Sequence, residues 1–429
     1  MQVFKVNKAF RVMIIAQFFN NIGSSFFNIV FLIYAATLPN KTLAVTLVAF
    51  AEFFPSLLSV VMGNLADKTK NHLRAWSFAR LSQAGIFLIV TVILTFWHGR
   101  FDSFILLLVL IFFADTIGSY SNLLMTPVSR YILSDDQLQN AMGLEQAVSI
   151  TVSLIGGFAG VGLLGLLHQD YAAFSLINTF MFIVAWLIMT VNRHHFKQAE
   201  AHIETTQRPK STQPMWHDLK TTFSYVYQDK LFFQLMLLAT AVNFIGTSLN
   251  GVFNVTLLHE KRLLIGSFGT TVAMFGAIFS TGMLLGSLLP IPFLSHLTTK
   301  QLLAVALTGV LGLELVPIIY PNGSVWMIIS FVVAYFNAQV NPKFGAILMK
   351  RIDQNKLASV SGLLNTFALS SAPVGQFLFL GIANLISPNI SWLIMAIVTL
   401  LIVIYIILTR QNDIEKVEKT GETAILYVL

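Results

Sequence analysis

Several ionisable side chains stand inside long apolar stretches of the sequence, where an isolated charge is costly. Asp115 and Glu52 are carboxylic acids in such stretches, and Arg80 is a base in another. A carboxyl group surrounded by apolar residues can take up and release a proton, because burial disfavours its charged form. We therefore predict Asp115 and Glu52 as proton-coupling residues. The alternative is a structural ion pair of either acid with Arg80, and Glu314 and Lys343 are interpreted as structural or interfacial.

Four apolar stretches also carry a polar residue at every third or fourth position. This spacing places each set on one face of a helix. The predicted cavity-lining residues are Gln17, Asn21, Ser24 and Asn28 in the first stretch, Ser119 and Asn122 in the fourth, Asn243, Thr247, Asn250 and Asn254 in the seventh, and Asn337 and Asn341 in the tenth. A polar face avoids lipid, so it faces other helices or water. Hydrogen bonding between helices is the alternative, but recurrence in every third stretch favours one shared cavity.

Catalytic and metal-binding patterns are absent from the sequence. None of the nine His residues is spaced with a carboxylate as a metal ligand inside an apolar stretch, and there is no Cys. The sequence has no Gly-Lys-Ser/Thr phosphate loop, so ATP is not the expected energy source. We expect neither an enzyme nor a bound cofactor or metal. A receptor or scaffold that transports nothing remains an alternative.

The composition indicates the elements that position these residues. Hydrophobic residues form 56% of the chain and charged residues only 10%, too few charges to cover a water-soluble surface. The apolar runs reach the roughly 20 residues that a helix needs to cross a bilayer, and they lack the short alternation of a barrel. The net charge of +7 is explained by basic cytoplasmic loops, so no nucleic-acid partner is expected.

The sequence therefore predicts an all-α membrane protein with twelve transmembrane helices in two pseudo-symmetric six-helix halves. The expected spans are 10–36, 43–65, 74–97, 103–129, 138–167, 171–192, 231–258, 267–294, 300–319, 323–349, 356–386 and 389–409. They define an N-terminal half over 1–192, a cytoplasmic linker over 193–229, a C-terminal half over 230–410 and a cytoplasmic tail over 411–429.

The distribution of basic residues predicts the orientation. With both termini in the cytoplasm, 20 of the 26 Lys and Arg residues fall on the inner side of these spans and four on the outer side. Basic residues concentrate in cytoplasmic loops, so both termini are expected there. Within the linker, apolar residues from Trp216 to Tyr227 share one helical face. They predict a helix lying on the membrane surface, with a solvated linker as the alternative.

Weak internal repeats support two related halves. An offset of 223 residues aligns Asn20–Ser25 with Asn243–Ser248, and an offset of 219 aligns Gly156 with Gly375. Two six-helix halves related by duplication are typical of transporters that bind their substrate between the halves.

One loop carries a specific motif. Gly63-Asn64-Leu65-Ala66-Asp67-Lys68 resembles the signature loop G-x-L-A-D-R-x-G-R-R of the major facilitator superfamily. The expected glycine and two basic residues that follow are replaced by Lys70, Asn71 and His72, and Arg74 restores part of the charge. The resemblance implies a secondary transporter whose inner gate involves Gly63, Asp67, Lys68 and Arg74. In that role Asp67 would approach the start of the eleventh span near 359–362, where free N–H groups stabilise a carboxylate. A solvated loop acid is the alternative.

Further short matches are similar to the drug-efflux branch that includes macrolide and siderophore exporters. They are Pro55, Leu57 and Leu58, then Leu138-Gln139-Asn140-Ala141, and Gly156, Gly157 and Gly160. This resemblance implies proton-coupled export of a lipophilic or amphipathic small molecule by alternating access. The alternative is uptake or exchange of a polar solute such as a sugar or an amino-acid-like compound. The expected partners are the substrate, the lipid bilayer and protons or sodium as the coupling ion. The expected state is a monomer in a bacterial plasma membrane.

Overall fold

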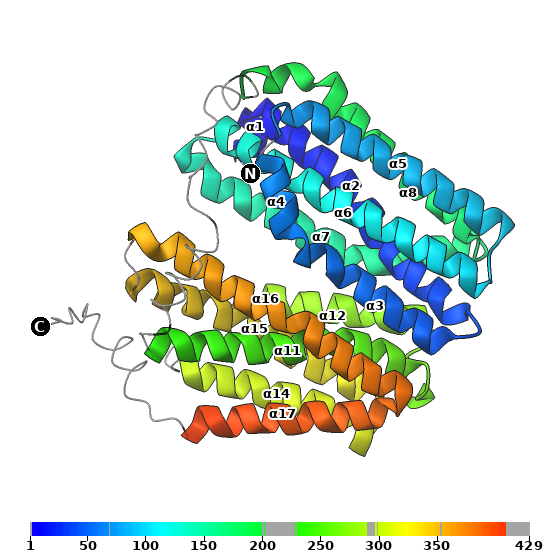
Figure 1. The fold of residues 1–429 in the computed structure, drawn as a ribbon, viewed down its shortest axis with the longest axis vertical. Coiled ribbons are helices and arrows are strands. Elements are labelled where there is room, and N and C mark those ends of the chain that lie inside the picture. Colours follow the sequence, from blue (N-terminus) through cyan, green and yellow to red (C-terminus); the bar gives the residue numbers. More distant parts are fainter. Residues whose placement is uncertain are drawn as a thin grey trace, which may run out of the picture. The chain divides into compact units, whose positions relative to one another are not determined.

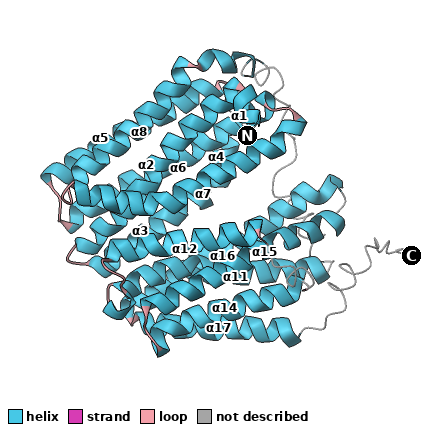
Figure 2. Cartoon of the chain, turned by 180° about the vertical axis from the view of Figure 1, so that it is seen from behind, coloured by secondary structure: helices cyan, strands magenta, loops and turns pink. Residues whose placement is uncertain are grey.

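The computed structural model describes residues 2–67, 69–199, 201, 227, 230–289, 297, 299–351 and 354–408. Within these ranges every regular element is a helix, as Figure 2 shows, and no strand is present. The first half of the chain forms the helices α1 (Gln2–Val6), α2 (Lys8–Thr37), α3 (Lys41–Leu57), α4 (Ser59–Asp67), α5 (His72–Phe96), α6 (Phe101–Ile132), α7 (Asp135–Leu166), α8 (Tyr171–Val191) and the 3-10 helix η1 (Arg193–Phe196). The second half forms α11 (Lys230–Leu257), the 3-10 helix η2 (Lys261–Leu263), α12 (Phe268–Leu288), α14 (Thr299–Ile319), α15 (Gly323–Arg351), α16 (Gln354–Leu385) and α17 (Pro388–Leu408).

The prediction of an all-α membrane protein is confirmed. In the described part of the chain, ten helices are long and apolar enough to cross a membrane. Within the described residues each of the twelve expected spans coincides with a helix, except that the second span is divided between α3 and α4. Residues 290–294 of the eighth expected span lie outside the described residues. The expected surface helix of the linker and the cytoplasmic tail lie almost wholly outside the described residues.

The division of the second span follows a proline. Pro55 lies inside α3, which ends at Leu57, and α4 begins at Ser59. Proline has no N–H to donate and its ring crowds the carbonyl group four residues earlier, so a helix kinks or breaks nearby. The ladder resumes at once, because the Met62 N–H donates to the Leu58 carbonyl oxygen at 2.8 Å. The break at Leu58 lies beyond Glu52, which belongs to α3.

The chain divides into two compact units. One contains residues 1–209 and 266–277, and the other contains residues 210–265 and 278–429. In the first unit α2 packs against α7 and α8, α5 packs against α6 and α8, and α3 and α4 pack against α6 (Figure 1). In the second unit α11 packs against α16 and α17, and α14 packs against α15 and α17.

Aromatic rings join the helices of the first unit. The rings of Phe27 on α2 and Phe87 on α5 meet edge to face with centroids 4.7 Å apart, and Phe87 contacts Phe182 on α8 at 5.3 Å. Phe31 stacks on Phe104 of α6 at 5.6 Å. Such contacts add to the apolar area that each ring buries. They join four of the five helices that line the pocket described below.

Glycines allow paired helices to approach closely in both units. A Cβ atom built on Gly156 of α7 would lie 3.0 Å from the Cβ of Ser25 on α2. A Cβ atom built on Gly375 of α16 would lie 2.8 Å from the carbonyl carbon of Phe244 on α11. Small residues allow helix backbones to approach closely in membranes. The two glycines that the repeat aligns therefore each face the first helix of their own half.

Candidate functional site

A buried arginine lies at the centre of the first unit. Arg80 on α5 is 2% exposed, and its guanidinium group donates to the side-chain oxygens of Asn20 on α2 and Gln83 on α5, the latter at 2.8 Å. It also donates to the Asn122 oxygen on α6 at 2.9 Å. The ring of Trp76, one turn earlier on α5, lies 5.3 Å from the guanidinium carbon. Three helices therefore supply neutral amides to one positive charge.

The amides are themselves held in place. The Gln83 amide nitrogen donates to the Ala114 carbonyl oxygen on α6 at 2.8 Å, so its oxygen is turned toward Arg80. A Cβ on Gly118 of α6 would lie 2.8 Å from that nitrogen, so the helix surface leaves room for the Gln83 side chain only because residue 118 has none. These amide groups orient the Arg80 side chain without neutralising its charge.

The described contacts of Arg80 contradict the alternative of a structural ion pair with an intramembrane acid. Arg80 hydrogen-bonds only to amides among the described residues, and neither Asp115 nor Glu52 forms an ion pair there. The reason is geometric, because Asn20, Gln83 and Asn122 already surround the guanidinium group. The two acids have to be explained separately from Arg80.

Glu52 and Asp115 lie near each other on packed helices. α3 and α6 are in contact, and the carboxyl group of Glu52 is close enough to Asp115 for their charges to interact. Asp115 is partly buried and Glu52 is exposed on the surface of the unit. Two interacting carboxylates repel when both are ionised, so protonation of one of them is favoured. The two predicted proton-coupling residues are thus brought together.

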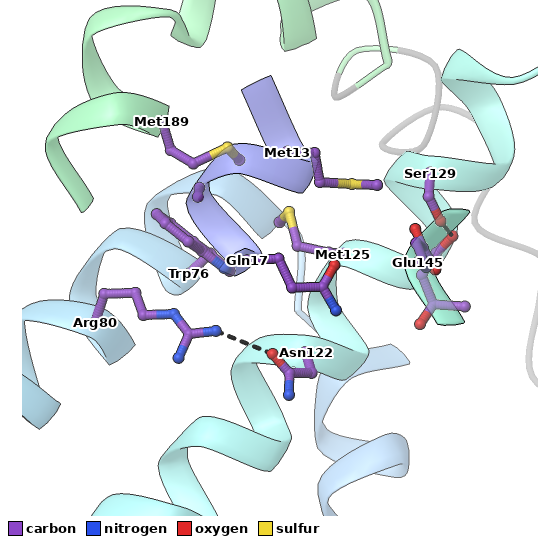
Figure 3. A pocket seen from close by; sticks show the side chains of 11 residues that line it. Met13, Gln17, Trp76, Arg80, Asn122, Met125, Ser129, Glu145 and Met189 are labelled. Carbon is purple, nitrogen blue, oxygen red and sulfur yellow. Dashed lines mark hydrogen bonds between the residues drawn. The ribbon is translucent and has the colours of Figure 1, made fainter. Parts of the chain in front are cut away.

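A small pocket opens beside Arg80 inside the first unit (Figure 3). Its volume is about 100 Å³, and its lining comes from α2, α5, α6, α7 and α8. The lining residues are Met13, Ala16, Gln17, Trp76, Arg80, Asn122, Met125, Thr126, Ser129, Glu145 and Met189. Gln17 and Asn122 from the predicted polar faces lie here, and Figure 3 shows the hydrogen bond from Arg80 to Asn122. Sulfur-containing side chains and Trp76 supply the apolar part of the wall.

The other residues of the polar faces have individual surroundings. Asn21 accepts a hydrogen bond from Asn20 at 3.3 Å, while Asn243 and Thr247 bond to carbonyl oxygens of their own helix. Asn254 is buried and Asn250 is exposed. The half-buried residues are Ser24, Asn28, Ser119 and Asn337, and the side chain of Asn341 lies outside the described residues. A cavity role for these residues remains a prediction.

The gate loop is described only in part. Gly63 has open space where a Cβ would stand, and Arg74 is exposed. Arg74 lines a groove of about 490 Å³ at the start of α5 and the end of α8, together with Arg193 and Lys197. The side chain of Asp67, residue Lys68 and the expected contact near 359–362 lie outside the described residues. The gate role therefore remains a prediction.

The sequence did not point to three residues of the site. Asn20 and Gln83 bind Arg80, and Glu145 on α7 lines the pocket. Gln83 follows Arg80 by three residues, a spacing that places both on one helix face, and this signal was available. Asn20 lies one position away from the polar face of its helix, and nothing in the spacing marks Glu145.

The second unit contains a buried acid of its own. Glu314 on α14 is fully buried, and its Oε1 atom accepts a hydrogen bond from the Thr399 hydroxyl of α17 at 2.9 Å. Its Oε2 atom has no hydrogen-bond partner within the described residues. The carboxyl group thus ties α14 to α17, which agrees with the structural interpretation.

We expect Glu314→Gln and Glu314→Ala to differ in their effect on stability. Glu314→Gln keeps an acceptor for Thr399 and should change the free energy of unfolding by less than about 1 kcal/mol, whereas Glu314→Ala leaves a cavity and a lost partner and should cost about 2–4 kcal/mol. Thermal unfolding of the two purified variants in detergent measures both values. Equal melting temperatures would contradict a structural tie.

The comparisons with known proteins identify the family. The model of the Major Facilitator Superfamily matches residues 13–376. Among curated proteins no match is found. A solved structure of the nucleoside transporter NupG is 12% identical, with 93% of this chain and 98% of that chain covered and a TM-score of 0.66.

Two further solved structures share the fold. A POT family transporter in complex with 5-aminolevulinic acid is 12% identical, covering 94% of this chain and 96% of its own with a TM-score of 0.67. The peptide transporter POT in complex with sulfate is 11% identical, covering 93% and 94% with a TM-score of 0.66. Identities this low establish the fold and not the substrate. The family match spans most of the chain, and the protein belongs to the Major Facilitator Superfamily.

Proposed function

We propose that this transporter of the Major Facilitator Superfamily exports a lipophilic or amphipathic small molecule in exchange for protons, by alternating access. The observation that carries the proposal is the proximity of Glu52 and Asp115 on α3 and α6, with no basic partner for either among the described residues. An intramembrane carboxyl pair that changes its proton content during the cycle links proton flow to a conformational change.

The direction of transport and the branch of the family are supported by the sequence, and not by the proximity of Glu52 and Asp115. The short matches around Pro55, 138–141 and Gly156 are similar to the drug-efflux branch, and on this ground we assign export. The charge distribution supports cytoplasmic termini. We place the protein as a monomer in a bacterial plasma membrane, with sodium as the alternative coupling ion.

A second candidate is uptake or exchange of a polar solute. The pocket beside Arg80 favours it, because Arg80, Gln17 and Asn122 present hydrogen-bonding groups to the space. The structural neighbours point the same way, since they are described as nucleoside and peptide transporters.

Flux measurements in energised cells test the proposal. Cells that produce the protein are loaded with a panel of lipophilic fluorescent dyes, and efflux is followed with and without a protonophore. Export predicts efflux above that of empty-vector cells, and proton coupling predicts that the protonophore removes the difference. A sodium gradient that sustains efflux in the presence of the protonophore would overturn proton coupling. Accumulation of radiolabelled amino acids or sugars inside the cells, without dye efflux, would instead support uptake.

A further inference from the structure

Arg80 presents a positive charge that the described protein groups do not neutralise. A guanidinium group has five N–H donors, and among the described residues Arg80 finds three acceptors, all neutral amide oxygens. Its buried Nε atom has no hydrogen-bond partner there. A buried charge without a counter-charge is costly, so the site is prepared for an anionic group. A carboxylate fits a guanidinium group best, since two parallel hydrogen bonds can form.

The opposite side of the same pocket carries a negative charge. Glu145 lies across the pocket from Arg80, with Gln17 and Asn122 between them in the close-up view (Figure 3). Arg80 and Glu145 do not form an ion pair with each other within the described residues. The pocket therefore has one positive side, one negative side and a neutral polar middle.

The apolar walls and the volume of the pocket limit the size and chemistry of the ligand that it can bind. Met13, Met125 and Met189 line the pocket with flexible apolar side chains, which adapt to varied apolar groups. The volume of about 100 Å³ corresponds to roughly three water molecules at about 30 Å³ each. This space holds the charged head of a small molecule, with a short apolar group against the methionines.

We propose that the pocket binds a zwitterionic, amino-acid-like molecule through two opposite charges. The carboxylate binds Arg80, the ammonium group faces Glu145, and the side chain lies on the methionine wall. A simple monocarboxylate would leave Glu145 without a partner, a simple amine would leave Arg80 without one, and a sugar would compensate neither. The inference rests on the second candidate function, transport of a polar solute, names the chemical class of that solute, and does not depend on the direction of transport.

The test measures ligand-induced thermal stabilisation of the purified full-length protein in detergent. The ligands are the standard L-amino acids, followed by the methyl ester and the N-acetyl derivative of the amino acid that stabilises most. Wild-type protein should bind each capped derivative at least about tenfold more weakly than the free amino acid, because each lacks one charge-assisted contact. Arg80→Gln should lose the discrimination against the methyl ester, and Glu145→Gln should lose the discrimination against the N-acetyl derivative.

Matched controls remove general effects of charge. Arg100→Gln changes an exposed arginine and Glu260→Gln a half-buried glutamate, both outside the pocket, and both variants should keep wild-type discrimination. If Arg80→Gln fails to fold, because Arg80 joins three helices, Glu145→Gln and Arg80→Lys decide the question. Glu145→Gln is then required to bind the free and the N-acetyl forms equally, and Arg80→Lys to bind the free acid more weakly than wild type.

Two results would overturn the inference. One is an absence of stabilisation by any amino acid, and the other is equal binding of capped and free forms by the wild type. The dye efflux assay separates this failure from failure of the proposed function. Protonophore-sensitive efflux without amino-acid binding would leave proton-coupled export standing and remove the zwitterion site.

Discussion

Asp115→Asn is expected to reduce protonophore-sensitive efflux to the level of empty-vector cells. Asparagine keeps the size and a hydrogen-bonding oxygen, but it cannot take up or release a proton. With Asp115 replaced, Glu52 on α3 loses the neighbouring charge on α6 whose repulsion makes its proton release conditional. Coupling should fail while the fold survives.

The design of this measurement includes a control on the same helix. Asp102 at the start of α6 is an exposed carboxylate that binds Arg100 at 2.7 Å, and Asp102→Asn should export at the wild-type rate. Glu52→Gln should reduce coupled efflux as Asp115→Asn does. The double variant should have no less efflux than the more impaired of the two single variants, because the effects of groups that act as a unit are not additive. Wild-type efflux in Asp115→Asn would remove Asp115 from the mechanism.

Gly375→Ala is expected to destabilise the second unit severely. The new Cβ atom would stand 2.8 Å from the carbonyl carbon of Phe244 and closer still to its oxygen, and a backbone group cannot swing aside as a flexible side chain can. Overpacking costs about 1–3 kcal/mol where neighbours can adjust, so a rigid neighbour places this variant at or above about 3 kcal/mol. We expect poor yield and a lowered melting temperature.

Another glycine on the same helix provides the control. Gly381 of α16 has no heavy atom within 4 Å of the position that a Cβ would take. Gly381→Ala should therefore keep the melting temperature or raise it slightly, since alanine favours the helix by about 1 kcal/mol. Equal melting temperatures for the two variants would show that α11 and α16 are not in backbone contact at Gly375.

The sequence predicted the helices well because their main signal is local. A run of about 20 apolar residues has few alternatives to a membrane helix, and charges and turns between runs mark the ends. Hydropathy does not predict the break at Leu58, although Pro55 lies close to it, because the apolar run continues across it. The α3–α4 division depends on backbone geometry that hydropathy does not record.

The candidate site was predicted less completely because its contacts join residues far apart in the chain. Helical spacing pointed to Gln17 and Asn122, which line the pocket beside Arg80, and their place in a shared cavity stays a prediction. The same spacing could not show that Arg80 would meet Asn20 and Asn122 and not an acid, because a period gives the face of a helix and not the partner across from it. Glu145 has no periodic companion and emerged only from the packing of α7.

The glycine contacts between helices also limit how the protein can move. Where α7 rests on the backbone of α2 at Gly160, and α16 on the backbone of α11 at Gly375, few side-chain atoms lie between the backbones to rearrange. Packed contacts of this kind have discrete arrangements and do not deform smoothly. Each of the two helix pairs, α2 with α7 and α11 with α16, is therefore expected to move as a rigid body. Any movement during a transport cycle then takes place at hinges outside these two pairs.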